Sequence, residues 1–222
     1  MWKTGRNSQN TKECLLEAAC HLFAEKGFSA TTNRDICSRA GANIAAINYH
    51  FGSKEKLYAE AWRKAFHNSL EKHPPDGGVP PDAPAEERLH GRIQAMIHKF
   101  ADKENPAFQI AHKEMAVPTS LLKEVKVECI GPLQEEMNNV LRELLGPEVP
   151  EQQVHFCQAS IESQCFRILR HTRTSGSIQP ETVSASSKDI EDDIAGYADH
   201  VFRFSLAGIK AVRSSIENDT DY

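Results

Sequence analysis

The chain of 222 residues is 40% hydrophobic and carries a formal net charge of −5 at pH 7, values that are ordinary for a globular protein of one or two domains. No run approaches the roughly 20 apolar residues of a membrane-spanning helix. The N-terminal stretch MWKTGRNSQNTKE lacks the apolar core of a signal peptide. These features argue against a membrane partner and predict a cytoplasmic protein.

The charge is distributed unevenly along the chain. Residues 1–72 carry 11 Lys and Arg against 7 Asp and Glu, a local excess of +4, whereas the remaining residues carry a net charge of −9. Since surfaces of opposite sign attract different molecules, a basic front and an acidic rear suggest two parts with different partners.

The cysteines and histidines indicate neither a catalytic site nor a metal site. None of the six cysteines forms a Cys-x-x-Cys pair, and the ten histidines show no His-Glu-x-x-His spacing. The alternative of an enzyme, built as a helical bundle that holds a metal or a nucleophile, lacks a pair of Glu-x-x-His motifs at bundle spacing and a cysteine with an obvious base nearby. We therefore expect buried, reduced cysteines, no cofactor and no catalytic residues.

Helical periodicity predicts a first helix over 11–26. Asn10 is placed to cap its N-terminus. Gly27 predicts the end of this helix, because glycine readily adopts the left-handed conformation that follows many helices. Phe28 then falls where the chain folds a side chain back onto Phe23.

Two short helices are predicted next, over 33–40 and 44–50. Thr32 and Asp35 match a capping box at the start of the first, and Gly41 ends it. Two short helices joined by a three-residue turn that contains glycine have the spacing of a helix-turn-helix, the motif that places its second helix in the major groove of DNA.

The rest of the chain is also predicted to be helical, so the fold class is all-α. A fourth helix runs from its N-cap Ser53 to about residue 71, and no sustained alternation indicates strands. Proline and glycine at 72–84, and a polar Ser- and Thr-rich segment at 173–187, predict flexible linkers. The remaining helices are expected over 85–102, 106–115, 118–145, 151–172 and 188–216.

The stretch IAAINYHFGSKEKLY, residues 44–58, begins with ten residues without a formal charge. Small side chains let a helix approach the base edges, where acidic chains would be repelled and long basic chains would hold phosphate without reading sequence. Ala45 and Ala46 can touch a thymine methyl, and Asn43 or Asn48 can pair with base edges. The alternative for the two alanines is that they only fill the helix.

Three residues that follow are predicted to hold the DNA backbone. Tyr49 and His50 offer hydrogen-bond donors. Lys54 opens the fourth helix, where free N–H groups and the positive end of the helix dipole attract a phosphate. Taken singly, Tyr49 is equally a packing ring, His50 an ordinary surface histidine and Lys54 a solvated charge, so the prediction depends on their order and spacing.

Residues 11–62 resemble the N-terminal DNA-binding domain of the TetR family of transcriptional regulators. The matching features are the A-x-x-L-F-x-x-x-G-[FY] start, T-T-x-x-[DE]-I, the A-G turn and Y-x-F-x-[SN]-K-x-x-L. Within that family, residues 11–62 are similar to the AcrR-like proteins, and most similar to a subgroup whose recognition segment reads N-I-A-A-I-x-Y-[HY]-F-G-S-K-E. The segment YADHVFRFSLAGIKAV resembles that subgroup's last helix.

The resemblance implies a helix-turn-helix DNA-binding domain over 1–53 and a helical ligand-binding and dimerisation domain over 54–222. It places Thr32 and Arg34 at phosphate and at the groove edge, which adds them to the seven candidate DNA contacts named above. Family members are all-helical homodimers in which two helices of each subunit form the interface, and a ligand cavity lies above the DNA-binding domain.

The second half of the chain yields two weaker predictions. Apolar stripes at spacings of three and four on the last two helices are typical of a bundle seam, so we expect a dimer interface there, with packing inside one chain as the alternative. Its candidate residues are Val154, Cys157, Ile161, Ile190, Ile194, Tyr197, Val201 and Phe204. An apolar cavity is the other prediction, with ordinary core packing as its alternative. Its candidate residues are Trp62, Phe66, Phe100, Phe108, His112, Met115, Cys165 and Phe166.

These features together predict a homodimeric repressor that a small molecule releases from its operator. The two-fold symmetry of a dimer predicts a palindromic operator in double-stranded DNA. The fourth helix joins the reading head to the expected cavity and would transmit the change. A regulator without a small-molecule effector and an activator are the alternatives. The sequence does not predict the ligand, the operator sequence or the regulated genes.

Overall fold

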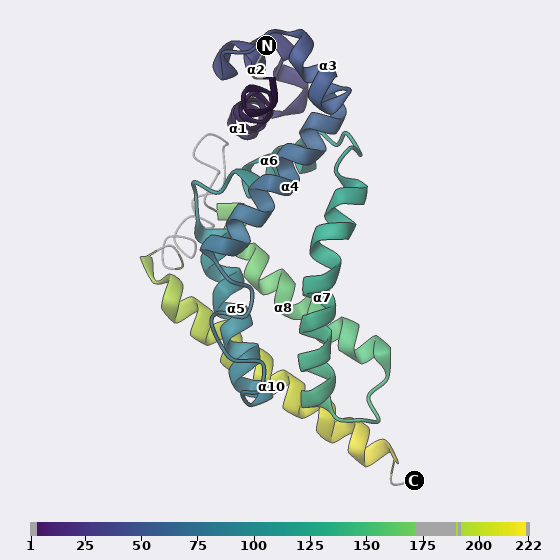
Figure 1. Ribbon diagram of the computed structural model, residues 1–222. Coiled ribbons are helices and arrows are strands. Elements are labelled where there is room, and N and C mark those ends of the chain that lie inside the picture. The colour runs from purple at the N-terminus through teal and green to yellow at the C-terminus, as the bar shows by residue number, and fades with distance from the viewer. Residues whose placement is uncertain (1–3, 172–189, 191, 221–222) are drawn as a thin grey trace. The chain divides into compact units, whose positions relative to one another are not determined.

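The computed structural model describes residues 4–171, 190 and 192–220, and every regular element within these residues is an α-helix (Figure 1). The predicted all-α class is confirmed. The chain divides into two compact units, here called the head unit and the body unit. They comprise Met1–Glu71 with Glu104–Ile130, and Lys72–Lys103 with Gly131–Tyr222. The functional boundary after residue 53 stays a prediction, because compactness does not test it.

The head unit is built around its first helix, which contacts α2, α3 and α6. Its elements are α1 (Thr4–Ala30), α2 (Asn33–Ala40), α3 (Ala45–Phe51), α4 (Lys54–Lys72) up to Glu71, α6 (Pro106–Ala116) and the start of α7 (Lys123–Leu145). The apolar side chains of the first helix are buried, and its Leu15 and Phe23 are completely inaccessible. The head unit therefore has its own hydrophobic core.

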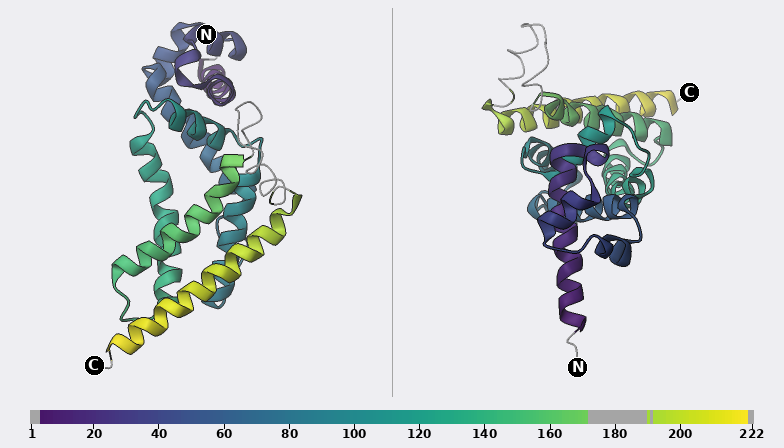
Figure 2. Two further views of the ribbon diagram at one scale, coloured as in Figure 1. Left: turned by 180° about the vertical axis from the view of Figure 1, so that it is seen from behind. Right: turned by 90° about the horizontal axis from the view of Figure 1, so that it is seen from above.

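The first helix begins at Thr4, earlier than predicted, and Asn10 does not cap it. Asn10 lies inside α1, where its Oδ1 is 3.9 Å from Sγ of Cys14. The physical reason is that extending a helix adds one hydrogen bond for each residue ordered, whereas starting one is costly, so a helix continues unless a residue stops it. The first turns of α1 extend away from α2 and α3 (Figure 2, right).

Gly27 interrupts α1 as predicted, but through a different conformation. Its φ of 79° and ψ of 174° lie in a region that essentially only glycine occupies. The kink brings the ring of Phe28 to 6.1 Å from the ring of Phe23 and 5.0 Å from that of Tyr58. The predicted return of Phe28 onto Phe23 is confirmed, and the aromatic cluster joins α1 to α4.

The body unit packs three long helices against one another. Its elements are α5 (Ala85–Ala101), the remainder of α7, α8 (Glu151–His171) and α10 (Ile194–Thr220). Helix α5 contacts both α8 and α10, which also contact each other (Figure 2). Leu89, Ile93 and Ile97 recur every fourth residue on α5 and are fully buried, as expected for the core-facing stripe of a helix.

One predicted helix start was too early. Helix α7 begins at Lys123 and not at 118, because Ser120 has a φ of 63° and Leu121 N donates to the Thr119 hydroxyl at 3.2 Å, which forms a turn before the helix. Of the helix predicted over 188–216, α10 covers Ile194–Thr220, and the predicted start at 188 lies outside the described residues. The linker predicted over 173–187 lies outside the described residues.

Residues 74–83, here called the strap, were predicted to be part of a flexible linker. They form successive hydrogen-bonded turns, with Gly77 N donating to Pro74 O at 3.0 Å and Ala83 N donating to Pro80 O at 3.1 Å. The strap contacts α5 through the backbone of Gly91. Proline and glycine therefore mark turns here, and not a featureless connection. Among the described residues, no helix has the length and apolar character needed to cross a membrane.

Candidate nucleic-acid interface

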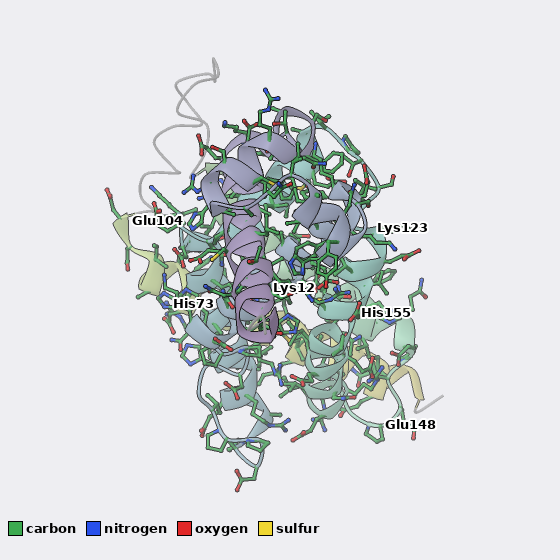
Figure 3. All side chains as sticks on the ribbon, turned by 45° about the horizontal axis from the view of Figure 1, so that its top comes forward. Lys12, His73, Glu104, Lys123, Glu148 and His155 are labelled. Carbon is green, nitrogen blue, oxygen red and sulfur yellow. The ribbon has the colours of Figure 1, made fainter. Side chains whose placement is uncertain are left out.

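Helix α3 has a buried side and an exposed side, and its two buried residues show which side is exposed. Ile47 is completely inaccessible and Phe51, one helical turn on, is nearly so. Lys12, labelled in Figure 3, places Nζ 5.7 Å from the centre of the Phe51 ring. Phe51 thus points inward, into the core of the head unit. With these two side chains held in the core, Asn48 and Tyr49 remain on the exposed side, and Tyr49 is 80% exposed.

The geometry of the turn between α2 and α3 confirms the predicted helix-turn-helix. Thr32 Oγ1 accepts from Asp35 N at 3.1 Å, and Thr32 N donates to Asp35 Oδ2 at 3.0 Å, which completes the capping box. The Thr32 backbone N–H also holds the pKa of Asp35 below its ordinary value. Gly41 then adopts the left-handed conformation, with φ 62° and ψ 32°. The exposed Thr32 and Arg34 stand at the start of α2.

Asn43 fixes the start of α3 with its side chain. Its Oδ1 accepts from Ala45 N at 2.9 Å, and its carbonyl oxygen lies 3.5 Å from Cys37 Sγ. The acceptor oxygen of Asn43, which was predicted to reach base edges, therefore caps a helix in the free protein. Ala45 is exposed and Ala46 half-buried, which leaves the backbone at the start of α3 open to approach.

The three candidate phosphate contacts lie at and just after the end of α3. The rings of Tyr49 and His50 meet edge to face at 4.8 Å. Lys54 Nζ lies 4.2 Å from the ring centre of Phe28, and its partial burial lowers the pKa of Lys54 from the ordinary lysine value. Between Asp35 and Glu55 the sequence contains no acidic residue. The whole turn and reading helix are thus free of charges that DNA would repel.

The sequence prediction omitted Ile44, which precedes the first residue of α3 and is 55% exposed. Single exposed aliphatic side chains are common on protein surfaces, so it is the position of Ile44 beside the candidate reading residues that adds it to them. Residues three positions apart lie on the same side of a helix, so the spacing from the buried Ile47 would place Ile44 in the core. The sequence therefore offered no signal for the exposure of Ile44, which only the structure shows.

The eight candidate cavity residues fall in both compact units. In the head unit, Trp62 and Phe66 are buried and stack at 5.0 Å, and Trp62 Nε1 donates to Ala107 O at 3.2 Å. In the body unit, Phe100 stacks on Phe166 at 4.6 Å. Of the others, Phe108 and His112 are half-buried, Met115 is exposed and Cys165 is buried. A single cavity that joins all eight stays a prediction.

The head unit also contains a buried polar cluster that links α4 to α6. Tyr58 donates its hydroxyl to Glu114 Oε2 at 3.0 Å, and the Thr119 hydroxyl and N–H donate to Glu114 Oε1, both at 2.8 Å. The Tyr58 ring in turn lies 4.8 Å from Phe23. Burial, followed by the nearby carboxylate, raises the pKa of Tyr58. The cluster thus connects α6 to the core beneath the reading helix.

The candidate dimer residues divide between core and surface. Val154, Ile161 and Val201 are buried within their own chain, and their part in a dimer interface stays a prediction. Tyr197 donates its hydroxyl to Gln164 O at 2.8 Å, which ties α10 to α8. Cys157, Ile190, Ile194 and Tyr197 are half-buried and Phe204 is exposed. The exposed apolar side chains on this face are Phe156 and Phe204, at 55% and 64%.

Two sequence families match the chain. The family described as bacterial regulatory proteins, tetR family, matches residues 15–61. The C-terminal domain of the HTH-type transcriptional dual regulator CecR matches residues 85–209, more than half of the chain. These are families of transcriptional regulators, which confirms the prediction of a regulator over an enzyme.

Individual relatives match short stretches of the chain. CecR of Shigella flexneri is 54% identical over 50 residues, which are 22% of this chain and 22% of that protein. The transcriptional repressor KstR2 of Rhodococcus jostii (strain RHA1) is 42% identical over 60 residues, 27% of this chain and 28% of that protein. The matched part therefore spans less than a third of either relative.

Solved structures share the fold over most of the chain. The fatty acid degradation regulator FadR from Bacillus halodurans superposes with a TM-score of 0.62 at 15% identity, over 89% of this chain and 95% of that one. A bacterial regulatory protein in the tetR family from Rhodococcus RHA1 superposes with a TM-score of 0.59 at 18% identity, over 87% and 95%. With the helix-turn-helix geometry and the two matched families, these findings show that the chain belongs to the TetR family of DNA-binding transcriptional regulators and has a CecR-type C-terminal domain.

Proposed function

We propose that this protein is a homodimeric repressor that binds a palindromic operator and leaves it when a small molecule binds. The observation that carries the proposal is the exposed side of α3, where Ile44, Ala45, Asn48 and Tyr49 present no acidic group. Such a surface can approach base edges closely, and Lys54 supplies a positive charge for the DNA backbone. Because its partner is DNA, we propose that the protein acts in the cytoplasm.

The dimer is supported by the apolar groove between α8 and α10. The groove has a volume of about 220 Å³ and is lined on its rim by Phe156 and Phe204. A second copy of the same face would remove both rings from water, and burial of one such ring contributes roughly 1.5–3 kcal/mol. A two-fold axis there would present two α3 helices to two half-sites, which is the basis of the palindrome.

Release by a ligand is supported by the contacts of α6 in the head unit. Glu114 and Ala107 of α6 bind Tyr58 and Trp62 of α4, and α4 begins directly after the reading helix. A ligand that favours one arrangement of these contacts would increase the population of that arrangement and of the reading-helix position that goes with it. The size of this shift is limited by the difference between the ligand's affinities for the two arrangements. The identity of the ligand is not part of the proposal.

A regulator that activates some promoters is the second candidate. The observation that favours it is the match to the C-terminal domain of CecR, a protein described as a dual regulator. The sign of regulation depends on where the operator lies relative to the promoter. Transcription in vitro from templates with the operator placed upstream of, or across, the promoter separates the two candidates.

Selection of bound sequences from random duplexes tests the proposal. We expect enrichment of an inverted repeat with half-sites one or more helical turns apart, together with a complex of two chains per operator. Enrichment of a single unrepeated site would contradict the dimeric mode of binding. No enrichment over the starting pool at low ionic strength would contradict DNA reading by α3.

Lys54→Ala is expected to weaken binding to every DNA sequence alike. Loss of one phosphate contact should lower the slope of log affinity against log salt by about 1. Lys123→Ala is the matched control, since Lys123 is an exposed lysine of the head unit outside the reading helix. Electrophoretic mobility shifts over a salt series measure both. Equal slopes for Lys54→Ala and the parent protein would exclude the proposed phosphate contact.

A further inference from the structure

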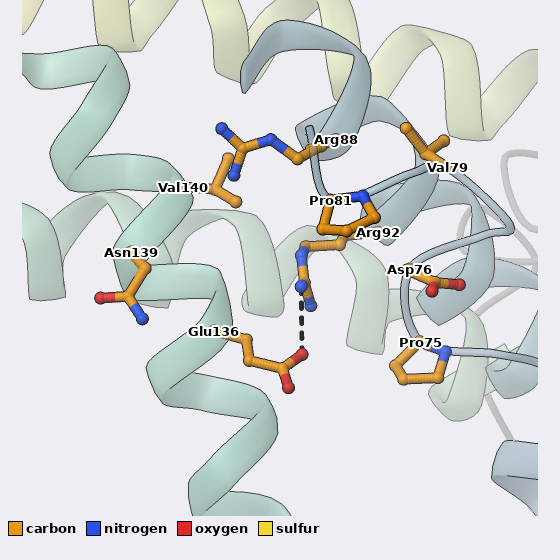
Figure 4. A pocket seen from close by; sticks show the side chains of 9 residues that line it. All are labelled: Pro75, Asp76, Val79, Pro81, Arg88, Arg92, Glu136, Asn139 and Val140. Atoms are coloured by element: carbon orange, nitrogen blue, oxygen red, sulfur yellow. Dashed lines mark hydrogen bonds and ion pairs between the residues drawn. The ribbon is translucent and has the colours of Figure 1, made fainter. Parts of the chain in front are cut away.

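The body unit contains a pocket that the functional argument does not use. It has a volume of about 470 Å³ and lies between the strap, α5 and α7 (Figure 4). None of the eight residues predicted to line a ligand cavity belongs to it. We call it the strap pocket, and its lining is Pro75, Asp76, Val79, Pro81, Arg88, Arg92, Glu136, Asn139 and Val140.

The wall formed by the strap is held at two points. Gly77 and Gly91 bring the backbones of the strap and α5 together so closely that a Cβ on Gly77 would lie 2.4 Å from Gly91 O. A Cβ on Gly91 would lie 2.5 Å from Asp76 O. At the other end, Arg88 Nε donates to Ala83 O at 2.8 Å. The pocket is therefore a built cavity with a docked wall, and not a gap beside a loose segment.

Two arginines of α5 form its polar side. The Arg88 and Arg92 side chains are 18% and 14% exposed, whereas their ion-pair partners Glu143 and Glu136 are 56% and 53% exposed. Arg92 Nη2 donates to Glu136 Oε2 at 3.0 Å, the contact drawn in Figure 4. Arg92 Nε is buried and finds no acceptor among the described residues. The arginines are thus held in place, while the glutamates that neutralise them lie at the solvent edge.

The chemistry of this lining indicates the class of ligand. The planar forks of arginine match carboxylate and phosphate oxygens, and an anion there would supply the acceptor that Arg92 Nε lacks. Pro75, Val79, Pro81 and Val140 supply apolar surface for a small organic body. Asp76 is already engaged, because its Oδ1 accepts from Gly78 N at 2.8 Å. Glu136 is therefore the one lining carboxylate that competes for Arg92.

We propose that the strap pocket binds a small organic anion, with a carboxylate or phosphate at Arg92 and Arg88 and an apolar body against the strap. The anion takes the place of Glu136 on Arg92, and the exposed glutamate turns to solvent. The proposed anion site does not depend on DNA binding. Each proposal, the anion site and the regulatory function, can therefore be rejected without rejecting the other.

Calorimetric titration of the purified full chain tests the proposal with three probes. Benzoate and phenyl phosphate carry the two anionic groups, and benzamide is the neutral analogue of benzoate. We expect at least one anion to bind about tenfold or more tightly than benzamide, because hydrogen bonds to a charged group are the stronger ones. Which anion binds distinguishes a carboxylate ligand from a phosphate ligand. Equal binding of all three probes, or of none, would overturn the proposal.

Variants of opposite expected sign locate the binding. Arg92→Gln should weaken the anion about tenfold, whereas Glu136→Gln should strengthen it severalfold because the competing carboxylate is gone. Arg203→Gln is the matched control, since Arg203 is an exposed arginine of α10 paired with Asp199. Circular dichroism checks that each variant is folded. Anion binding by Arg92→Gln at the parental affinity would place the ligand elsewhere and reject the assignment.

Discussion

At the scale of single residues, Ile44 is the side chain that folding alone does not explain. It stands exposed at the start of the reading helix, next to Asn43 and Ala45. The exposed part of this aliphatic group meets water in the free protein, whereas in a major groove it can contact the methyl group of thymine. Its exposure therefore fits a role in reading sequence better than a role in stability.

Replacing thymine by deoxyuridine in the half-sites tests this role of Ile44. Removal of one buried methyl should weaken binding of the parent protein about fourfold, since a methyl contributes about 0.8 kcal/mol. Ile44→Ala should bind the thymine operator more weakly and respond less to the replacement. Ala45→Gly, a neighbouring change in α3, controls for a general loss of contact. If Ile44→Ala keeps the full response, another residue reads the methyl.

The buried Lys99 makes the free energy of unfolding depend on pH, and comparison with a variant that lacks Lys99 isolates this contribution. It is buried in α5, and this burial lowers its pKa from 10.5 to about 8. Between these values the unfolded chain binds more protons than the folded one, so the contribution of Lys99 to the free energy of unfolding rises with pH. Below pH 8 the cost of burying the charge is present in full.

Lys99→Met should therefore be more stable than the parent protein at pH 7.5, by up to about 3 kcal/mol. The difference should narrow by about 2 kcal/mol at pH 9.5, where Lys99 is largely neutral when folded. Buried Cys20 and Cys165, whose pKa values burial raises to about 12, affect both proteins equally. Urea unfolding at the two pH values measures the gap, and a gap independent of pH would show that the pKa of Lys99 is the same in the folded and unfolded chains.

At the scale of elements, glycine decides where helices end and how closely they approach. Gly27 allows the kink in α1 that brings Phe28 back to Phe23 and Tyr58. Its φ of 79° is strained for any side chain, and a Cβ would also meet Lys113 Cδ at 3.3 Å. The join between α1, α4 and α6 therefore depends on a missing side chain.

Gly27→Ala is expected to lower the free energy of unfolding by about 1–3 kcal/mol, the cost of a residue held in such a conformation. Gly131→Ala is the control at a glycine without a positive φ. Gly131 lies inside α7, where a Cβ would meet nothing beyond its chain neighbours, so alanine should change the free energy of unfolding by no more than about 1 kcal/mol, with the gain in helix propensity opposed by the ring of Pro132. Chemical denaturation of both variants tests this pair. A Gly27→Ala protein as stable as the parent would mean that the kink can be rebuilt without cost.

At the scale of the whole molecule, the open question is what covers the face formed by α8 and α10. Phe156 and Phe204 leave apolar surface on a face whose Val154, Ile161 and Val201 are already buried. In a two-fold dimer, this face of one copy would pack against the same face of the other. A single contact would then cover Phe156 and Phe204 on both copies.

Phe204→Glu should shift the protein from dimer to monomer in sedimentation equilibrium and weaken operator binding. A charge at the centre of an apolar contact must lose its hydration without a partner, which costs several kcal/mol. Val127→Glu introduces the same charge at an exposed apolar residue of the head unit and should leave the dimer intact. A dimeric Phe204→Glu protein would exclude this face as the interface.

Much of the head could be predicted because its signals are local. The capping box of Thr32 and Asp35, the left-handed Gly41 and the N-cap Ser53 each depend on residues within a few positions of one another. The start of α1 was predicted wrongly because a local signal is not always decisive. Asn10 has the chemistry of a cap, but whether a helix continues past such a residue depends on the competing helical hydrogen bonds.

The rest required the fold. An apolar stripe shows that a helix face will be covered but not which neighbour covers it, so sequence alone could not separate the core residues Val154 and Val201 from the exposed Phe204. The strap is the clearest case. Its prolines and glycines specify turns, but its docking onto α5 depends on the close approach to Gly91 and on the hydrogen bond from Arg88 to Ala83 O. The sequence by itself therefore determined most of the helices, the capping box of α2 and the helix-turn-helix, whose causes lie within a turn or two of chain. The tertiary structure decided the buried faces, the exposure of Ile44 and the strap pocket, because these depend on contacts between residues distant in sequence.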